Sequence, residues 1–384
     1  MEKQLYKSKK QHPFNSSLNV LINNILKMKK TIYGIVILTL LFSCEGKSDI
    51  NRNKRDKKLL ETLGSFPEKP QLSIDTLEIA KLKNGWRYKI KYLAEDSIPS
   101  LGIPKDWVFA YLFVPSAEAN NKRPGIVAIH QDDINYHIGK SEPTGLMGDS
   151  TMFYGLELFN QGYIVICPDR FYHAERRLLS KLQPGYQKKY INPERDRMLL
   201  DYQAGLLFLQ GRTIYSKEAY DVSRAVDVLF STNIVDEDNI GIIGHSAGGN
   251  VVPYAMLFDK RIKLGVSSCG TFDIIRSFNM NIPQPFPALM TIPNLVKSNL
   301  TTADYLKSIY PRSLLLTRGK HEWGKGDPGS IAMVEELKEF ENVYNSNGGK
   351  GDIKTIVFEE GGGGHAFPDS IKGDVYKWMD QRLK

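Results

Sequence analysis

A glycine-rich motif directly after a short apolar run is the feature that most limits what this chain can fold into. The run is Ile240–Ile243 (I-G-I-I), and the motif that follows is G-H-S-A-G-G over Gly244–Gly249. The next stretch, Asn250–Phe258, has a helical composition. A strand, a tight turn with a central serine and a helix together make a nucleophile elbow. Because that turn requires small neighbours, we expect Ser246 to project from the carboxyl end of a buried strand.

Short apolar runs alternate with helical patterns through most of the chain. A continuous run rich in branched residues is typical of a strand buried on both faces of a parallel sheet. Besides the run before Ser246, the predicted strands are Gly125–His130, Tyr163–Cys167, Ile262–Ser267, Ser313–Thr317 and Ile353–Phe358. Apolar stripes predict helices over Glu218–Phe230 and from Ile331 to Phe340. The alternation predicts an α/β fold with a mostly parallel sheet covered by helices on both faces.

Four further segments complete the predicted architecture. Thr76–Leu93 and Val108–Val114 look like strands that form an antiparallel edge on the same sheet. Phe171–Ser216 and Thr271–Tyr310 interrupt the alternation, and both follow the carboxyl ends of strands, where ligands bind in open α/β sheets. We expect both to be cap insertions around a pocket, with an ordinary surface excursion as the alternative for the first.

A serine hydroxyl becomes a good nucleophile only when a base removes its proton. His365 ends the run E-E-G-G-G-G-H directly after the last predicted strand, where such a base belongs. The acid that orients the histidine should follow the strand Ser313–Thr317. Glu322 lies one short turn beyond that strand and is the predicted acid, with Asp327 as the alternative. His321 is expected to lie beside the site without acting as its base.

An oxyanion hole needs two backbone N–H groups that point at the developing charge. One is expected from Ala247, directly after the serine. The other is expected from the loop after Gly125–His130, where Gln131 or Asp132 is the candidate donor.

The N-terminal segment has the pattern of an export signal. Three lysines precede the apolar run Ile32–Phe42, which is too short to span a membrane unaided. The sequence L-F-S-C ending at Cys44 resembles a bacterial lipobox, in which the cysteine is lipidated. The alternatives are a cleaved signal with an incidental cysteine and an uncleaved membrane anchor. A conventional signal also begins at Met28, which would make residues 1–27 an over-called start.

These features predict a division of the chain into three parts. Residues 1–43 would be the signal peptide, residues 44–67 a charged flexible tether, and residues 68–384 the catalytic domain. The expected location is the bacterial cell envelope, with the protein exported and attached to the membrane through its N-terminal lipid. Cys167 and Cys269 lie in apolar runs and are expected to be buried core thiols.

The net charge of +8 does not indicate a nucleic-acid partner. Residues 1–43 contain seven lysines and one acid, so the excess of +6 belongs to the signal and only +2 to the remainder. We find no basic stripe with interleaved aromatic residues in that remainder, and nucleic acid is therefore not expected as a partner.

Several motifs resemble the dienelactone-hydrolase-related and acetyl-xylan-esterase-like branch of the α/β-hydrolases, from about Val108 to Lys384. They are A-I-H-Q at Ala128, G-Y-I-V-I-C-P-D-R at Gly162, A-E-R-R at Ala174, D-V-S-R-A-V-D-V-L at Asp221, N-I-G-I-I-G-H-S-A-G-G at Asn239 and D-K-R-I-K at Asp259. The resemblance implies an α/β-hydrolase fold and hydrolysis of carboxylic esters or lactones without a metal or other cofactor. Ser246 and His365 match the catalytic residues of that branch, and Glu322 stands where an aspartate is commoner. The dienelactone branch proper has a cysteine nucleophile, from which Ser246 departs.

Three functions are compatible with this pattern. The first is a lipid-anchored serine esterase that acts on a small-molecule or carbohydrate ester. The second is a serine peptidase of the prolyl-oligopeptidase type, although only about sixty residues separate the predicted tether from the first parallel strand, too few for the propeller domain of those enzymes. The third is a non-catalytic binding lipoprotein on the same fold.

Overall fold

The computed structural model describes residues 52–384 apart from 117–121, 133–135, 191–192, 281–290 and 347–351. Asp56–Lys384 form one compact unit. The predicted signal peptide and Cys44 lie outside the described residues. Among the residues that the structure describes, no helix is both long enough and apolar enough to span a membrane.

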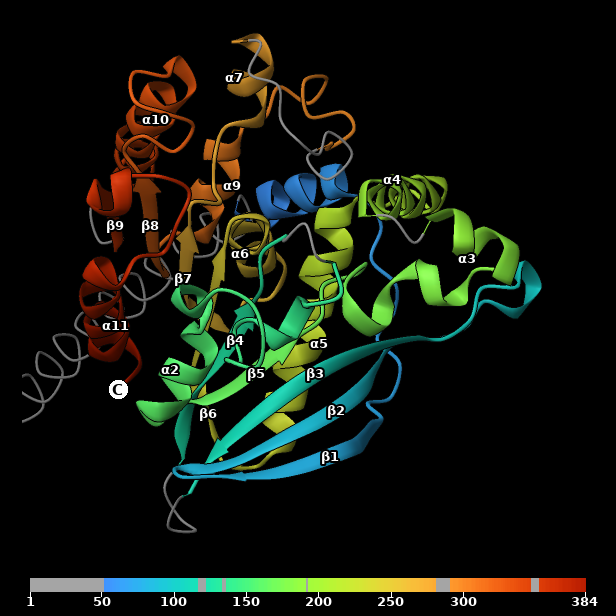
Figure 1. The fold of residues 1–384 in the computed structure, drawn as a ribbon. Coiled ribbons are helices and arrows are strands. Elements are labelled where there is room, and N and C mark those ends of the chain that lie inside the picture. The colour runs from blue at the N-terminus through green and yellow to red at the C-terminus, as the bar shows by residue number, and fades with distance from the viewer. Residues whose placement is uncertain (1–51, 117–121, 133–135, 191–192, 281–290, 347–351) are drawn as a thin grey trace, which may run out of the picture. The chain divides into compact units, whose positions relative to one another are not determined.

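A single mixed sheet forms the centre of the fold (Figure 1). Its strands are β1 (Ile74–Leu82), β2 (Gly85–Glu95), β3 (Asp106–Pro115), β4 (Arg123–Ile129), β5 (Ile164–Pro168), β6 (Val235–His245), β7 (Ile262–Ser268), β8 (Ser313–Gly319) and β9 (Ile353–Phe358). Their spatial order is β1-β2-β3-β5-β4-β6-β7-β8-β9. All pairings from β5 through β9 are parallel, so the predicted parallel sheet is confirmed.

The antiparallel edge is also present, with one more strand than the apolar pattern suggested. Thr76–Leu93 contains a hairpin of β1 and β2, whose turn at Lys83-Asn84 is followed by Gly85 at φ 152°. β3 then joins this hairpin to β5 in antiparallel pairing. The dipeptide Asn84-Gly85 interrupts the alternation and is a signal of a hairpin turn, which the expectation of one strand over Thr76–Leu93 overlooked.

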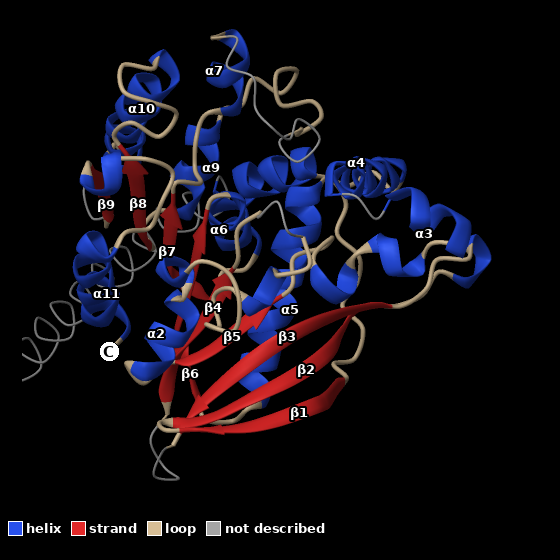
Figure 2. Ribbon diagram, in the orientation of Figure 1, coloured by secondary structure: helices blue, strands red, loops and turns tan. Residues whose placement is uncertain are grey.

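Helices cover both faces of the sheet (Figure 2). They are α2 (Tyr154–Asn160), α3 (Pro184–Tyr190), α4 (Pro193–Leu209), α5 (Ile214–Ser231), α6 (Ala247–Phe258), α7 (Ile274–Asn279), α9 (Thr302–Ile309), α10 (Pro328–Asn345) and α11 (Asp369–Leu383). One apolar core joins alternate strand residues such as Val127 to α5, α6 and α10. The other joins the intervening residues, such as Ile126, to α2 and α11. A strand with both faces buried reads as a continuous apolar run, which is the pattern that predicted it.

The prediction of a flexible tether over residues 44–67 is wrong from Asp56 onward. Residues 52–63 are helical, and Leu59 and Leu63 are completely buried in the larger core. Ion pairing between Asp56 and Lys260 and a hydrogen bond between Thr62 and Tyr305 add polar contacts. The exposed positions of this helix, among them Lys54, Lys57 and Lys58, gave the segment the composition of a linker, whereas Leu59 and Leu63 face the core.

The two predicted cap segments contain short helices at the carboxyl ends of the strands. The first includes two 3-10 turns, at Ala174–Arg176 and Leu178–Lys181, before α3 and α4. The second includes α7 and α9.

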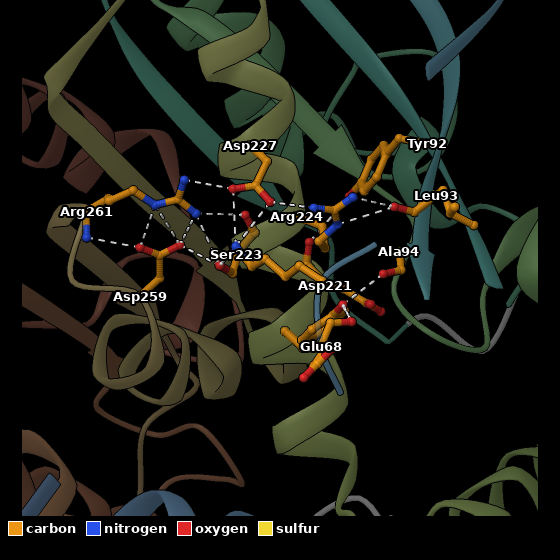
Figure 3. Close-up of polar contacts among 12 residues, drawn as sticks. Glu68, Tyr92, Leu93, Ala94, Asp221, Ser223, Arg224, Asp227, Asp259 and Arg261 are labelled. Atoms are coloured by element: carbon orange, nitrogen blue, oxygen red, sulfur yellow. Dashed lines mark hydrogen bonds and ion pairs between the residues drawn. The ribbon is translucent and has the colours of Figure 1, made fainter. Parts of the chain in front are cut away.

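A largely buried polar network holds α5 in place (Figure 3). It includes Asp259, which follows the end of α6 remote from Ser246. Arg224 donates to the carbonyl oxygen of Leu93 in β2 and pairs with Asp227 at 2.7 Å. Ser223 donates to Asp259 at 2.6 Å, and Asp259 also pairs with Arg261. The network therefore ties one helix both to the antiparallel edge and to the turn between α6 and β7.

Candidate active site

Ser246 stands between β6 and α6 in a conformation that L-residues rarely adopt, with φ 53° and ψ −123°. Its N–H donates to the carbonyl oxygen of Ser268 at 2.8 Å, which holds the turn against β7. A residue kept in such a sparsely populated region is a feature of functional turns. The strand, turn and helix predicted around Ser246 are all present.

The elbow packs directly on the loop that follows β4. A Cβ atom at Gly248 would lie 2.5 Å from the carbonyl oxygen of His130, so only glycine allows this approach. Ala247 begins α6, and the N–H groups of a first helical turn have no partner within the helix. The elbow therefore lies against the end of β4 at Gly248, and the assignment of the oxyanion N–H groups to Ala247 and to Gln131 or Asp132 stays a prediction.

The side chains of this loop are held by neighbouring residues. Asp132 pairs with Arg170 and accepts a hydrogen bond from the Tyr172 hydroxyl at 2.8 Å. Gln131 donates from Nε2 to Glu142 at 3.0 Å. The side chains of Gln131 and Asp132 are therefore engaged in contacts that stabilise the loop.

His365 and Glu322 are in direct contact, with 2.6 Å between His365 Nδ1 and Glu322 Oε1. They come from the loops after β9 and β8, which lie side by side because those strands pair in parallel. The Glu322 side chain is 1% exposed and that of His365 is 31% exposed. A buried carboxylate therefore fixes Nδ1 and leaves the other ring nitrogen, Nε2, for proton transfer.

Arg318, the penultimate residue of β8, holds the other side of Glu322. Its Nη1 lies 3.1 Å and 3.0 Å from the two carboxylate oxygens, and the guanidinium is almost completely buried. Burial alone would raise the pKa of Glu322, but the charge of Arg318 and the hydrogen bond from His365 outweigh it and lower that pKa. The carboxylate is therefore ionised at neutral pH.

Asp327, the alternative acid, has a different place. Its side chain accepts a hydrogen bond from the N–H of Ser330 at 2.9 Å and caps the N-terminus of α10. Such a cap stabilises a helix. The geometry thus brings Glu322, and not Asp327, to the histidine.

Two aromatic rings flank the imidazole of His365. The ring of His245, which precedes Ser246, lies 4.9 Å from it between centroids. Burial, the nearby His365 and Arg318 lower the pKa of His245 well below its ordinary value, so His245 is neutral. The ring of Trp323 lies 6.0 Å away on a nearly parallel plane. Ser246 and His365 therefore both border His245.

His321 and Cys269 are neighbours of the site. His321 donates its N–H to the carbonyl oxygen of Gly363 and its ring lies 3.6 Å from Glu359, so it supports the histidine loop. Cys269 is a buried free thiol, as is Cys167, in agreement with the prediction of core thiols. Burial raises the pKa of Cys269 to about 12, and the thiol is therefore protonated.

Two groups of side chains among the described residues have atoms close enough to share a metal ion. In the first, Cys269, Glu322 and His365, the carboxylate is already engaged by Arg318 and the imidazole. In the second, Glu95, Asp106 and Asp221, the cationic side chain of Lys217 lies among the carboxylates. Neither arrangement needs a metal to balance its charge.

A narrow gap, too small to admit a water molecule, adjoins the first turns of α6. Its lining comes from α5, α6 and the second cap segment, and consists of Tyr215, Asn250, Pro253, Tyr254, Thr271, Phe272, Ile274 and Thr302. The second cap segment thus packs against α5 and α6 at this gap, and its role around a substrate pocket stays a prediction.

Three residues of this site were not identified from the sequence. Arg318 could have been suspected, because a charge at the end of a buried apolar strand requires a partner. His245 and Trp323 gave no comparable signal, since a histidine inside the motif and a tryptophan in a loop are compatible with many roles.

The strand order, the elbow and the loop positions define the α/β-hydrolase fold, which confirms the fold class expected from the sequence. Similar folds occur in a protein from Bacteroides fragilis NCTC 9343 described as an acetyl xylan esterase and in the glucuronoyl esterase from Solibacter usitatus. The first is 16% identical, with a TM-score of 0.61 and coverage of 81% of this chain and 75% of that chain. The second is also 16% identical, with a TM-score of 0.57 and coverage of 86% and 92%.

Sequence comparisons agree with this class. The model of the prolyl oligopeptidase family matches residues 212–321, which include Ser246. YtaP of Bacillus subtilis (strain 168), whose name describes it as a hydrolase, is 26% identical over 336 residues. That alignment covers 86% of this chain and all of the relative.

Proposed function

We propose that this protein is a serine hydrolase that cleaves carboxylic esters, with acylated carbohydrates as the substrate class. The main supporting observation is the contact of 2.6 Å between His365 and the buried Glu322, beside the strained turn of Ser246. The similarity in fold to esterases named for acetyl xylan and for glucuronoyl esters supports the substrate class.

The proposed reaction passes through an acyl-enzyme. Ser246 Oγ attacks the ester carbonyl carbon while Nε2 of His365 takes the hydroxyl proton, and Glu322 stabilises the imidazolium. The N–H groups of Ala247 and of Gln131 or Asp132 donate to the oxyanion. The alcohol leaves with the proton from His365. Water, activated by the same nitrogen, then releases the acid and restores Ser246.

An organophosphonate tests this proposal, because it mimics the tetrahedral species. It should label Ser246 covalently, fail to label Ser246→Ala, and react much more slowly with His365→Ala. Asp327→Asn provides the control, since it alters a helix cap and should label normally. Absence of labelling in a folded sample would contradict the proposal and favour a non-catalytic binding protein.

A serine peptidase is the second candidate, and the match to the prolyl oligopeptidase family over residues 212–321 favours it. Both activities use the same nucleophile, so the leaving group distinguishes them. Purified protein should cleave short acyl esters faster than matched amides. Faster cleavage of the amides would move the assignment to a peptidase.

We also propose that the protein is exported and lipid-anchored through Cys44. Support comes from the lysines and apolar run before L-F-S-C. Cys44→Ala should release the protein from the membrane fraction, whereas Cys167→Ala should not. Unchanged partitioning, with no lipid on the N-terminal peptide, would contradict the anchor.

A further inference from the structure

Trp323 directly follows the proposed catalytic acid and presents its ring to solvent. Its exposed fraction is 45%, and its ring lies nearly parallel to the imidazole of His365, with 6.0 Å between the ring centroids. A ligand that covers an exposed indole removes apolar surface from water, which favours binding. Its place beside the catalytic base indicates that the partner is the substrate.

The indole is fixed in position before any ligand arrives. Its Nε1–H lies 3.3 Å from Met333 Sδ, and the backbone N–H of Trp323 donates to Ser330 Oγ at 2.9 Å. Both partners belong to α10, and both are buried. A ring held at one edge by a rigid helix loses little conformational entropy when a ligand stacks on it.

The chemistry of ester cleavage decides which part of the substrate lies near Trp323. The leaving oxygen receives its proton from His365, so the alcohol portion must lie next to that ring. The acyl portion is bonded to Ser246 and lies toward the oxyanion donors. A surface beside His365 therefore contacts the alcohol and not the acyl group.

The surroundings of Trp323 identify the type of alcohol. The residues that follow it, Gly324, Lys325 and Gly326, are all exposed. A long apolar alcohol would require an apolar wall around its remaining surface, which this polar loop does not supply. A sugar ring has one apolar face of C–H groups and an outward rim of hydroxyls that remain hydrated.

We propose that Trp323 is the alcohol-side subsite of the enzyme, where its indole stacks against the sugar ring of an acylated carbohydrate. This inference rests on the proposed esterase function. It adds a specific residue and a specific side of the ester to that function.

Three acetate esters with different alcohols test the subsite: an acetylated methyl xyloside, ethyl acetate and octyl acetate. In Trp323→Ala, KM for the sugar ester should rise about 5-fold with kcat nearly unchanged, as expected for the loss of one stacked ring. For ethyl acetate, kcat/KM should stay within about 2-fold, because its alcohol is too small to reach the indole. Trp323→Phe should retain most of the affinity for the sugar. Trp86→Ala, at an exposed tryptophan of β2, is the matched control.

Two outcomes would overturn the subsite. An equal fall in kcat for all three esters would mean that Trp323 only supports His365. A larger loss of kcat/KM on octyl acetate than on the sugar ester would mean that the subsite at Trp323 binds an apolar alcohol.

Binding without turnover separates this inference from the proposed function. Ser246→Ala and the double variant Ser246→Ala/Trp323→Ala should be titrated calorimetrically with the acetylated methyl xyloside. Affinity about 5-fold weaker in the double variant would support the subsite at Trp323 even if the wild-type protein hydrolysed no ester. Equal affinity of the single and the double variant would contradict the subsite at Trp323, even if the wild-type protein were an active esterase.

Discussion

Ser246 holds its backbone at φ 53° and ψ −123°, a conformation that lowers the stability of the fold for any residue with a Cβ atom. Ser246→Gly removes that Cβ atom together with the hydroxyl. We therefore expect this variant to lose esterase activity. Its free energy of unfolding should be about 1–2 kcal/mol larger than that of the wild-type protein, which means that it is more stable. Urea denaturation followed by circular dichroism measures the difference.

Ser246→Ala is the control for that prediction, because alanine lacks the hydroxyl but keeps the Cβ atom. It should be equally inactive and close to the wild-type stability. If both variants had the same stability, the turn would not be strained.

The carboxylates of Glu322 and Asp327 contact different groups, so substitutions at the two residues should have different effects on kcat. Glu322→Gln should lower kcat at least about 100-fold, because it removes the charge that stabilises the imidazolium. Asp327→Asn should leave kcat nearly unchanged and alter stability by less than about 1 kcal/mol, since asparagine also caps helices. Ester hydrolysis and thermal unfolding of both variants test this ranking. The reverse ranking would transfer the role of the acid to Asp327.

The sequence allowed Ser246, His365 and Glu322 to be proposed because each follows a recognisable strand in the order that the fold requires. Arg318 and Trp323 could not be assigned in that way. Their roles depend on side-chain contacts at the end of β8 and in the loop after it, which the strand pattern does not specify. What the sequence predicts at this scale is the backbone position of a group and not its contacts.

Helix 52–63 shows how an element can be overlooked when its charges dominate its composition. Leu59 and Leu63 are completely buried. Leu59→Ala should therefore reduce the free energy of unfolding by about 2–5 kcal/mol, from lost burial and the cavity that remains. Lys57→Ala, on the exposed side of the same helix, should change it by less than about 0.5 kcal/mol. Chemical denaturation compares the two. Equal, small effects would mean that the helix is only loosely attached.

The first residue of β3 makes stability depend on pH. Asp106 is paired with Arg176 at 2.7 Å and with Lys217 at 2.6 Å. Burial tends to raise the pKa of Asp106, but these two cations outweigh it and lower that pKa in the folded state. The stabilisation is therefore complete above the unfolded value of about 4 and is lost as pH falls below it.

Urea midpoints between pH 6 and pH 3 test this dependence. The wild-type free energy of unfolding should fall over that range, and Asp106→Asn should show a smaller fall because it has no carboxylate to protonate there. Asp75→Asn, at an exposed residue of β1, should follow the wild-type curve. Parallel curves for wild type and Asp106→Asn would contradict the assignment.

At the scale of the whole molecule, the parallel sheet was predictable and the attachment of its N-terminal helix was not. The strands are continuous apolar runs because both faces are buried, and this signal is local in sequence. The helix depends on contacts with residues far along the chain, which leave no local pattern. The strands could therefore be predicted because burial on both faces gives each of them a short, continuous apolar run in the sequence.

The contacts of helix 52–63 also determine when it can reach its final place. Thr62 bonds Tyr305, and Lys58 donates to the carbonyl oxygen of Ser298, across separations of 243 and 240 residues. At a synthesis rate of about 5–20 residues per second, roughly 10–50 seconds pass before those partners exist. During that interval the apolar side of the helix is open to chaperones. The first described element to be synthesised is thus among the last to be packed, and a ribosome that stalls late would leave it uncovered.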